Sequence, residues 1–163
     1  MNKLYLITGP AGVGKSTISK LLAEKLDKSI LIEGDDIYHM VISGYVSAWK
    51  PNNHLELFWK NIISLIQNGL ENGYDVVFNY IINKKDYELL KDKFKEYNII
   101  FKVLLVSEEE LLRRDKLRDP SCRMNERCLV LLNNFKYVIN KNDTKLNNTS
   151  NTINLDAVQV YFD

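Results

Sequence analysis

Residues 9–17 combine closely spaced glycines with a lysine and two hydroxyl side chains, a composition suited to binding phosphate. The spacing G-x-x-x-x-G-K-[ST] is satisfied at Gly9, Gly14, Lys15 and Ser16. Glycines let the backbone turn so that consecutive N–H groups point at one anion. The lysine adds a point charge to the outer phosphates, and the serine hydroxyl suits Mg²⁺. The residues predicted to bind a nucleotide phosphate are Gly9, Pro10, Ala11, Gly12, Val13, Gly14, Lys15, Ser16 and Thr17.

Two acidic residues, Asp35 and Asp36, follow the apolar run at 29–33. Phosphoryl transfer needs a carboxylate near the γ-phosphate, where it accepts the proton of the attacking hydroxyl or holds Mg²⁺ through water. We expect Asp35 to have this role, because it follows a glycine at the end of the run, and Asp36 to cap the next helix. In the alternative interpretation, both aspartates only cap that helix.

All five arginines fall between positions 113 and 127, whereas the rest of the chain uses lysine for positive charge. An arginine offers a planar fork that suits phosphate oxygens and stacking on a base. Arg114 and Arg118 are spaced i, i+4, so we expect both to lie on one helix face and to reach one ligand. Arg123 follows Pro120 in a segment expected to move. In the alternative, the arginines form a solvated helix face and pair with neighbouring acids.

Asn79 ends the apolar run at 75–79, where many P-loop proteins have a magnesium-associated aspartate. An amide can hydrogen-bond a metal-bound water but has no charge. This departure predicts a lower catalytic rate, unless Asp35 supplies the missing charge. It bears less on nucleotide binding, which depends on residues 9–17.

Aromatic residues and histidines gather between the runs at 29–33 and 75–79. In an α/β protein, a segment between two strands at this position can cover the site of a phosphoryl acceptor. Phe58 and Trp59 are expected to belong to a helix core. The candidates for contact with an acceptor are His39, Tyr45 and Trp49.

Strand and helix patterns alternate along the chain, which favours an α/β fold in which helices cover a parallel sheet. In such a sheet, ligands bind beyond the carboxyl ends of the strands, and residues 9–17 would lie there. The predicted strands are 3–8, 29–33, 75–79, 99–106 and 146–149. The predicted helices are 15–27, 36–43, 54–72, 84–96, one that follows Ser107, 125–139 and 154–162.

The 163 residues are expected to form one domain over 1–163, large enough for a substantial core. The net charge of +1 gives no electrostatic argument for a nucleic acid or a membrane as partner. Cys122 and Cys128 lack metal-ligand spacing and are expected to be free thiols. Only four apolar residues precede the glycine-rich run, too few for a signal peptide or a membrane span. We therefore expect a cytoplasmic location. Nothing in the sequence indicates an oligomeric state.

Four segments together resemble the small P-loop kinases of metabolites and nucleosides, a group that includes gluconate kinase, shikimate kinase, adenylate kinase, adenylylsulfate kinase and chloramphenicol phosphotransferase. Within that group, the chain is most similar to gluconate kinase-like and tunicamycin-resistance-like ATPases of bacteria. The resemblance implies a three-layer α/β fold with a five-stranded parallel sheet in the order 2-3-1-4-5. It also implies helices on both faces and a short lid, at about 115–126, that closes over ATP. The four segments are 7–17, 32–35, 110–115 and 124–129.

The resemblance also implies roles for single residues. Asp35 matches the acceptor-side acid, Arg114 the arginine near adenine and Arg118 the arginine on phosphate. Thr149 and Ser150 fall in the segment 148–151, which resembles the loop that passes the adenine ring.

Together these features predict a kinase that uses ATP and Mg²⁺ to phosphorylate a hydroxyl of a small molecule, such as a sugar acid like gluconate, a nucleoside or an antibiotic. Two alternatives are a nucleotide-dependent binding or resistance protein that transfers nothing, and a polynucleotide 5′-kinase, which the neutral charge disfavours. The expected catalytic residues are Lys15, Asp35 and Arg118, and the expected metal ligands are Ser16 and Asp35. The expected acceptor contacts are Asp35, His39, Tyr45, Trp49, Asn79 and Arg123.

Overall fold

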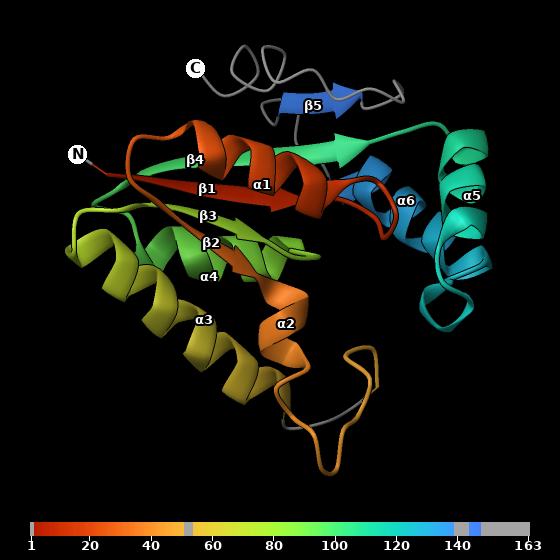
Figure 1. Ribbon diagram of the computed structural model, residues 1–163, viewed down its shortest axis with the longest axis horizontal. Helices are drawn as coiled ribbons and strands as arrows, with labels where there is room; N and C mark the ends of the chain where they lie inside the picture. Colours follow the sequence, from red (N-terminus) through yellow and green to blue (C-terminus); the bar gives the residue numbers. More distant parts are fainter. Residues whose placement is uncertain (1, 51–53, 139–143, 148–163) are drawn as a thin grey trace.

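A five-stranded parallel sheet forms the centre of the protein in the computed structural model, which describes residues 2–50, 54–138 and 144–147. The strands lie in the order β2-β3-β1-β4-β5 (Figure 1). Both the order and the parallel direction agree with the predicted fold class. The strands are β1 Lys3–Thr8, β2 Ser29–Glu33, β3 Asp75–Asn79, β4 Asn98–Leu105 and β5 Thr144–Asn147.

Helices cover both faces of this sheet and complete three layers. On one face, α3 and α4 pack through Phe58, Ile62 and Leu90. On the other face, α1, α5 and α6 form a second buried cluster with the strands. The helices are α1 Lys15–Lys25, α2 Gly34–Tyr38, α3 His54–Glu71, α4 Lys84–Lys93, α5 Glu108–Leu117 and α6 Glu126–Val138, and a 3₁₀ turn spans Pro120–Cys122.

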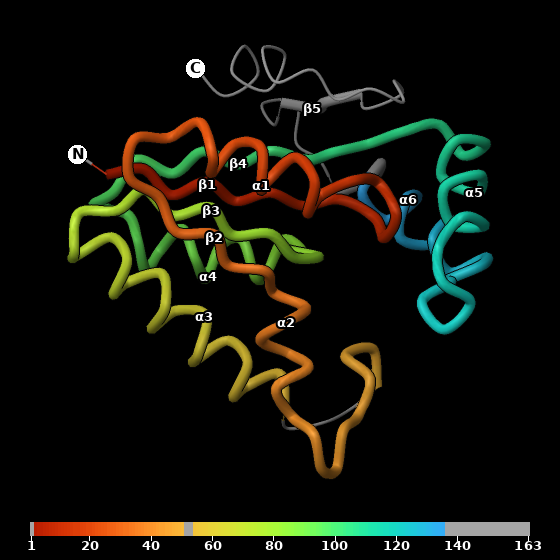
Figure 2. Tube along the Cα trace, in the orientation of Figure 1, coloured from red at the N-terminus to blue at the C-terminus, as the bar shows by residue number. Residues whose placement is uncertain are grey.

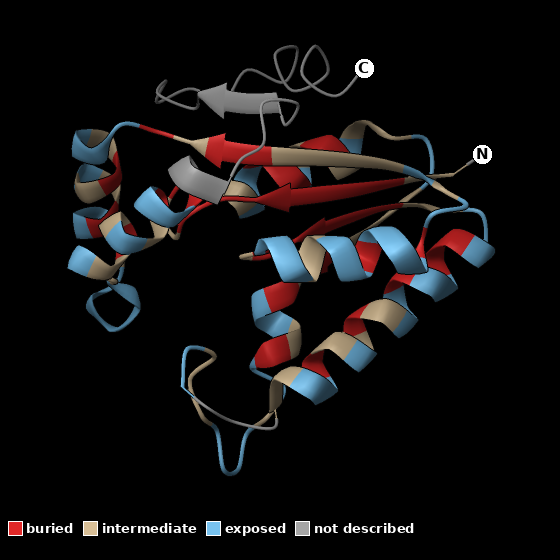
Figure 3. Cartoon of the chain, turned by 180° about the vertical axis from the view of Figure 1, so that it is seen from behind, coloured by how far each residue is buried: buried red, intermediate tan, exposed pale blue. Residues whose placement is uncertain are grey.

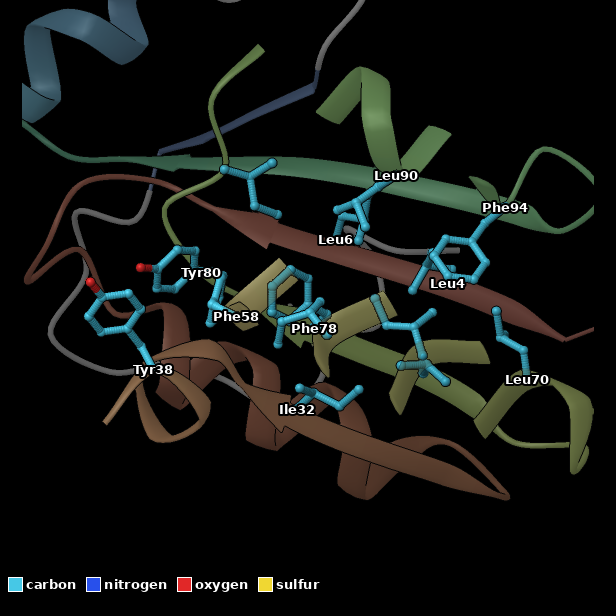
Figure 4. Packing of buried hydrophobic residues seen from close by; sticks show 14 residues of the cluster. Leu4, Leu6, Ile32, Tyr38, Phe58, Leu70, Phe78, Tyr80, Leu90 and Phe94 are labelled. Atoms are coloured by element: carbon cyan, nitrogen blue, oxygen red, sulfur yellow. The ribbon is translucent and has the colours of Figure 1, made fainter. Parts of the chain in front are cut away.

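The central strands are apolar on both faces, which explains their continuous apolar runs. Along β1, Leu6 contacts the α3 and α4 side, whereas Tyr5 and Ile7 contact the α1 side. The same alternation along β3 sends Phe78 to the α3 side and Val77 to the α1 side. Figure 3 shows the buried strands between helices whose outer faces are exposed, and Figure 4 shows the cluster on the α3 side.

Most predicted elements form within a few residues of their expected bounds, with one informative exception. The helix expected at 36–43 begins instead at Gly34 and ends at Tyr38. Asp36 therefore lies in the first turn of α2, and the expectation that it caps the helix is wrong. The last strand covers Thr144–Asn147 rather than 146–149, and the helix expected at 154–162 lies outside the described residues.

Three segments lie beyond the carboxyl ends of the strands (Figures 1 and 2). They are the loop between β1 and α1, the helix α2 with the arm at 39–50, and the turn between α5 and α6. The arm, defined here as residues 39–50, extends away from the sheet in Figure 2. In the part of the chain that the structure describes, no helix has both the length and the apolar character that a membrane crossing requires.

Candidate active site

The glycine-rich loop between β1 and α1 has the backbone conformation that the motif requires. Gly9, Gly12 and Gly14 have φ angles of 146°, 84° and 105°, in the region that side chains disfavour. A Cβ atom on Gly9 would also collide with the carbonyl oxygen of Leu104, so β4 approaches the loop closely. Gly14 is the N-cap of α1, so the free N–H groups of that helix open toward the loop.

The side chain of Lys15 binds the backbone of the glycine-rich loop. Its Nζ donates to the carbonyl oxygens of Gly9, at 3.0 Å, and Pro10, at 3.1 Å. Burial lowers the pKa of Lys15 from 10.5 to about 8, Arg118 adds to this effect, and the charges of Asp35 and Glu33 oppose it. The ammonium is therefore weakly solvated and faces acidic side chains, a state in which an added phosphate would stabilise its charge.

Glu33, the last residue of β2, is a site residue that sequence reasoning missed. Its Oε2 accepts a hydrogen bond of 2.9 Å from the hydroxyl of Ser16, the predicted magnesium ligand. Glu33 is also opposite Asn79 in the register of β2 and β3. The available signal was its position at the end of a predicted strand beside the phosphate loop, but a strand-end glutamate is too common to single out.

Asn79 is 4% exposed, and its Nδ2 has no hydrogen-bond partner among the described residues. Val77, two residues earlier on β3, packs on the α1 side, so alternation places Asn79 on that side as well. The amide therefore lies at the end of the sheet on the same face as α1. It donates to none of the surrounding protein groups, although a buried amide normally has a partner.

Asp35 is in the first turn of α2, directly beyond β2. Its negative charge acts on the ammonium of Lys15 and also on the hydroxyls of Tyr45 and Tyr80, whose pKa values rise because of burial first and the nearby charges second. One carboxylate is thus within electrostatic reach of both the phosphate-binding lysine and the tyrosines beside the arm. Asp36 is exposed.

The aromatic candidates of the arm are only partly brought together. His39 and Tyr45 stack with ring centroids 5.5 Å apart, and Tyr45 Oη lies 3.3 Å from His39 Nε2. Trp49 instead lies against the guanidinium of Arg127, at 4.1 Å. Phe58 is buried in the core as predicted, and Tyr80 packs against its ring at 4.6 Å.

The arginines do not form the pair that their spacing predicts. Arg118 is the C-cap of α5 with an extended backbone, so it does not share a helix face with Arg114, and that prediction is wrong. Arg114 binds the carbonyl oxygen of Val13 at 2.9 Å, so it braces the phosphate loop from α5. Arg118 lies 3.6 Å from Asp115 and adds positive potential at Lys15, and its carbonyl accepts from Arg123 at 3.1 Å.

Several remaining predictions concern residues away from this cluster. Thr149 and Ser150 lie outside the described residues, so their predicted contact with adenine stays a prediction. Cys122 is exposed and Cys128 is buried, and both are free, as expected. Among the described residues, no group of three or more histidine, cysteine or acidic side chains is arranged to hold a metal ion alone. A metal at this site would therefore need phosphate or water as further ligands.

Comparison with protein families finds one that spans most of the chain. A family model described as AAA domain matches residues 6–135, which include the phosphate loop, Asp35 and the arginines of α5. A guanylate kinase of Fusobacterium nucleatum subsp. nucleatum is 27% identical over 132 residues, which cover 70% of this chain and 70% of that protein.

Solved structures share the fold. A chain of the Pnkp1/Rnl/Hen1 RNA repair complex superposes with a TM-score of 0.72 and 20% identity, and covers 84% of this chain. This chain spans only 45% of that one. The tunicamycin resistance protein of Deinococcus radiodurans has a TM-score of 0.70 at 16% identity, with coverage of 98% and 93%. A gluconokinase of Sinorhizobium meliloti 1021 has a TM-score of 0.66 at 16% identity, with coverage of 96% and 86%.

Proposed function

The chain belongs to the AAA domain family, whose model spans residues 6–135, and from this premise we propose that it is an ATP-dependent kinase acting on a hydroxyl of a small molecule. Its resemblance to P-loop kinases, in sequence and in fold, supports a phosphotransferase. The observation that carries the proposal is Asp35, whose charge reaches both Lys15 and Tyr80. In this proposal, Asp35 serves the phosphoryl donor and the acceptor together from the first turn of α2, directly beyond β2.

In this proposal, the acceptor oxygen bonds to the γ-phosphorus of ATP while the bond from that phosphorus to the bridging oxygen breaks. ADP leaves with the bonding electrons, and Asp35 accepts the proton of the hydroxyl. Lys15 leaves the carbonyls of Gly9 and Pro10 and stabilises the negative charge on the transferring group. Arg118, which already adds positive potential at Lys15, supplements it.

The side chains also fit a magnesium ion, which would neutralise phosphate charge when bound. Mg²⁺ prefers oxygen ligands and usually keeps several waters, so one hydroxyl and one nearby carboxylate are sufficient protein partners. Ser16 provides the hydroxyl, and Glu33, 2.9 Å from it, provides the carboxylate. We propose that Glu33, together with Asp35, supplies the charge that Asn79 does not.

Two other functions remain as alternatives. A nucleotide-dependent binding protein would use the same phosphate loop without transfer, and the uncharged Asn79 is the feature in its favour. A polynucleotide 5′-kinase would need a basic surface for its substrate, and the net charge of +1 offers little of this kind. A chain of an RNA repair complex shares the fold, with a TM-score of 0.72. An oligonucleotide is therefore included in the acceptor panel.

The experiment measures ADP production from Mg-ATP, alone and with sugar acids, nucleosides, antibiotics and a 5′-hydroxyl oligonucleotide. We expect one small-molecule class to raise the rate, and Lys15→Ala and Asp35→Asn each to lower the stimulated rate by at least about 100-fold. Asp36→Asn is the matched control, since Asp36 is exposed on the same turn of α2. Full activity of Asp35→Asn, or equal losses in the two aspartate variants, would refute the role given to Asp35.

A further inference from the structure

The acceptor side of the site is rich in acids and aromatic rings and poor in basic side chains. Residues 34–50, which form α2 and the arm, include two aspartates, no arginine and one lysine, the exposed Lys50 at the far end of the arm. A phosphate or carboxylate on the acceptor would need a cation in this segment or one that reaches into it. The composition is therefore unusual for a site that binds an anionic acceptor.

The rings of this segment form a connected group. Tyr38 meets Tyr45 edge to face, with centroids 5.9 Å apart, and its hydroxyl donates to the carbonyl of Val46 at 2.7 Å. His39 stacks on Tyr45, with an interplanar angle of 23°. The hydrogen bond from Tyr38 ties the arm at Val46 back to the end of α2, so these faces are arranged before any ligand arrives.

Tyr80 extends this group from the end of β3. Its ring lies against the backbone of Gly34, where a Cβ atom would be 2.6 Å from Cδ2 of the ring. Figure 4 shows the hydroxyl oxygens of Tyr38 and Tyr80 at the same end of the cluster. Burial raises the pKa of Tyr80, and the negative charges of Asp35 and Asp86 raise it further. Tyr80 is therefore a hydrogen-bonding group in a negative field, and Tyr38 adds a second hydroxyl to the cluster.

The basic side chains around this cluster are exposed, lie at the far end of the arm or act at the phosphate loop. Lys84 and Lys85, in the first turn of α4, are exposed. Arg127 contacts the arm at Trp49, where its guanidinium lies over the ring, 4.1 Å from the centroid. Lys15 and Arg118 face the phosphate loop, where the nucleotide needs them. The cluster around Tyr80 is therefore acidic, aromatic and rich in neutral hydroxyls.

We propose that the acceptor is an uncharged, ring-bearing alcohol of the nucleoside type, and not a carboxylate or a phosphate ester. The inference rests on the proposed kinase function and names its substrate class. A planar ring packs on the faces of His39 and Tyr45, and its sugar hydroxyl reaches Asp35. A second anion beside Asp35 and Asp86 would be repelled.

The test compares matched neutral and anionic acceptors. Guanosine, uridine and adenosine are assayed against their 5′-monophosphates and gluconate, by ADP production and by calorimetric binding in the presence of a non-hydrolysable Mg-ATP analogue. We expect kcat/KM for at least one nucleoside to exceed that for its monophosphate and for gluconate at least tenfold. Tyr80→Phe should raise KM for the nucleoside, whereas Tyr74→Phe, just before the amino end of β3 and so at the other end of the strand from Tyr80, should not.

A charge-insertion variant gives an independent readout. Tyr45→Arg places a cation in the cluster and should shift the binding ratio of nucleoside to monophosphate at least tenfold toward the monophosphate. Leu65→Arg, which adds the same charge on α3, should leave the ratio unchanged.

Faster turnover with gluconate or a monophosphate, or no binding and no stimulation by any nucleoside, would overturn the inference. Failure of the kinase proposal would look different: no compound or oligonucleotide would raise ADP production, although Mg-ATP still binds and Lys15→Ala abolishes that binding.

Discussion

Raising the pH should weaken ATP binding well below the pH at which an ordinary lysine loses its proton. Burial holds the pKa of Lys15 at about 8 in the nucleotide-free protein. A bound phosphate stabilises the ammonium and returns its pKa toward the ordinary value of about 10.4. Since binding then requires a proton on Lys15, affinity is full below pH 8 and falls about tenfold per pH unit above it.

The magnitude follows from the two pKa values. Between pH 7.5 and pH 9.5, a free-state pKa of about 8 and a bound-state pKa above 10 give an increase of about 25-fold in Kd, or about 2 kcal/mol. Isothermal titration with Mg-ATP at saturating Mg²⁺ measures this change, because the γ-phosphate is ionised throughout the range.

Lys15→Arg is the matched control, because a guanidinium keeps its charge across this range. Its Kd should depend on pH much less steeply, whatever its absolute affinity. A change of less than threefold in the natural protein, or the same slope in the arginine variant, would refute the reasoning. In that case, the ammonium would be protonated throughout, and its burial would not control nucleotide binding.

Three further predictions concern the residues around the loop. Glu33→Gln should raise the Mg²⁺ concentration needed for half-maximal nucleotide binding about tenfold. Glu33→Asp, which keeps the charge, should raise this concentration less. The same Mg²⁺ midpoint in the natural protein and in Glu33→Gln would contradict the role of this carboxylate. Gly34→Ala should lower the free energy of unfolding by about 2 kcal/mol in urea denaturation, because the added methyl would collide with the buried ring of Tyr80, and an unchanged midpoint would show that the ring can move. Arg114→Ala should weaken ATP binding about tenfold by calorimetry, since it removes a charge-assisted bond to the phosphate loop, whereas Arg113→Ala, which removes the ion pair with Glu110 on α5, should change it less than twofold.

The fold was predictable because its determinants are local and strong. Each central strand is a continuous apolar run, and the glycine-rich motif marks where β1 ends and α1 begins. The start of α5 after Ser107, whose hydroxyl accepts from the N–H of Glu110, likewise follows a short-range rule. The order of strands came from the resemblance, since apolar patterns alone do not distinguish neighbours in a parallel sheet.

The parts of the site that escaped prediction depend on side chains far apart in the sequence. At the start of α2, the backbone of Gly34 packs against the ring of Tyr80 from the end of β3, a contact between residues far apart in the sequence. Helical periodicity placed Arg118 beside Arg114, but α5 ends one residue before Arg118. The hydrogen bond between Glu33 and Ser16 joins two elements, so no local pattern could reveal it.

The exchange of charge between two neighbouring strands gives Asn79 a physical explanation. Glu33 and Asn79 are register partners, and strands in a sheet lie about 4.8 Å apart, so a carboxylate at either position could serve nearly the same point in space. If both positions carried a carboxylate, the two negative charges would repel each other at the end of the strands, and this repulsion would raise the free energy needed to ionise the second group. With Glu33 charged and bound to Ser16, an amide at 79 removes that repulsion and leaves one negative charge beside the phosphate loop. Under the proposed function, the asparagine is therefore explained by a carboxylate that lies on β2 instead of β3, without loss of the proposed magnesium site.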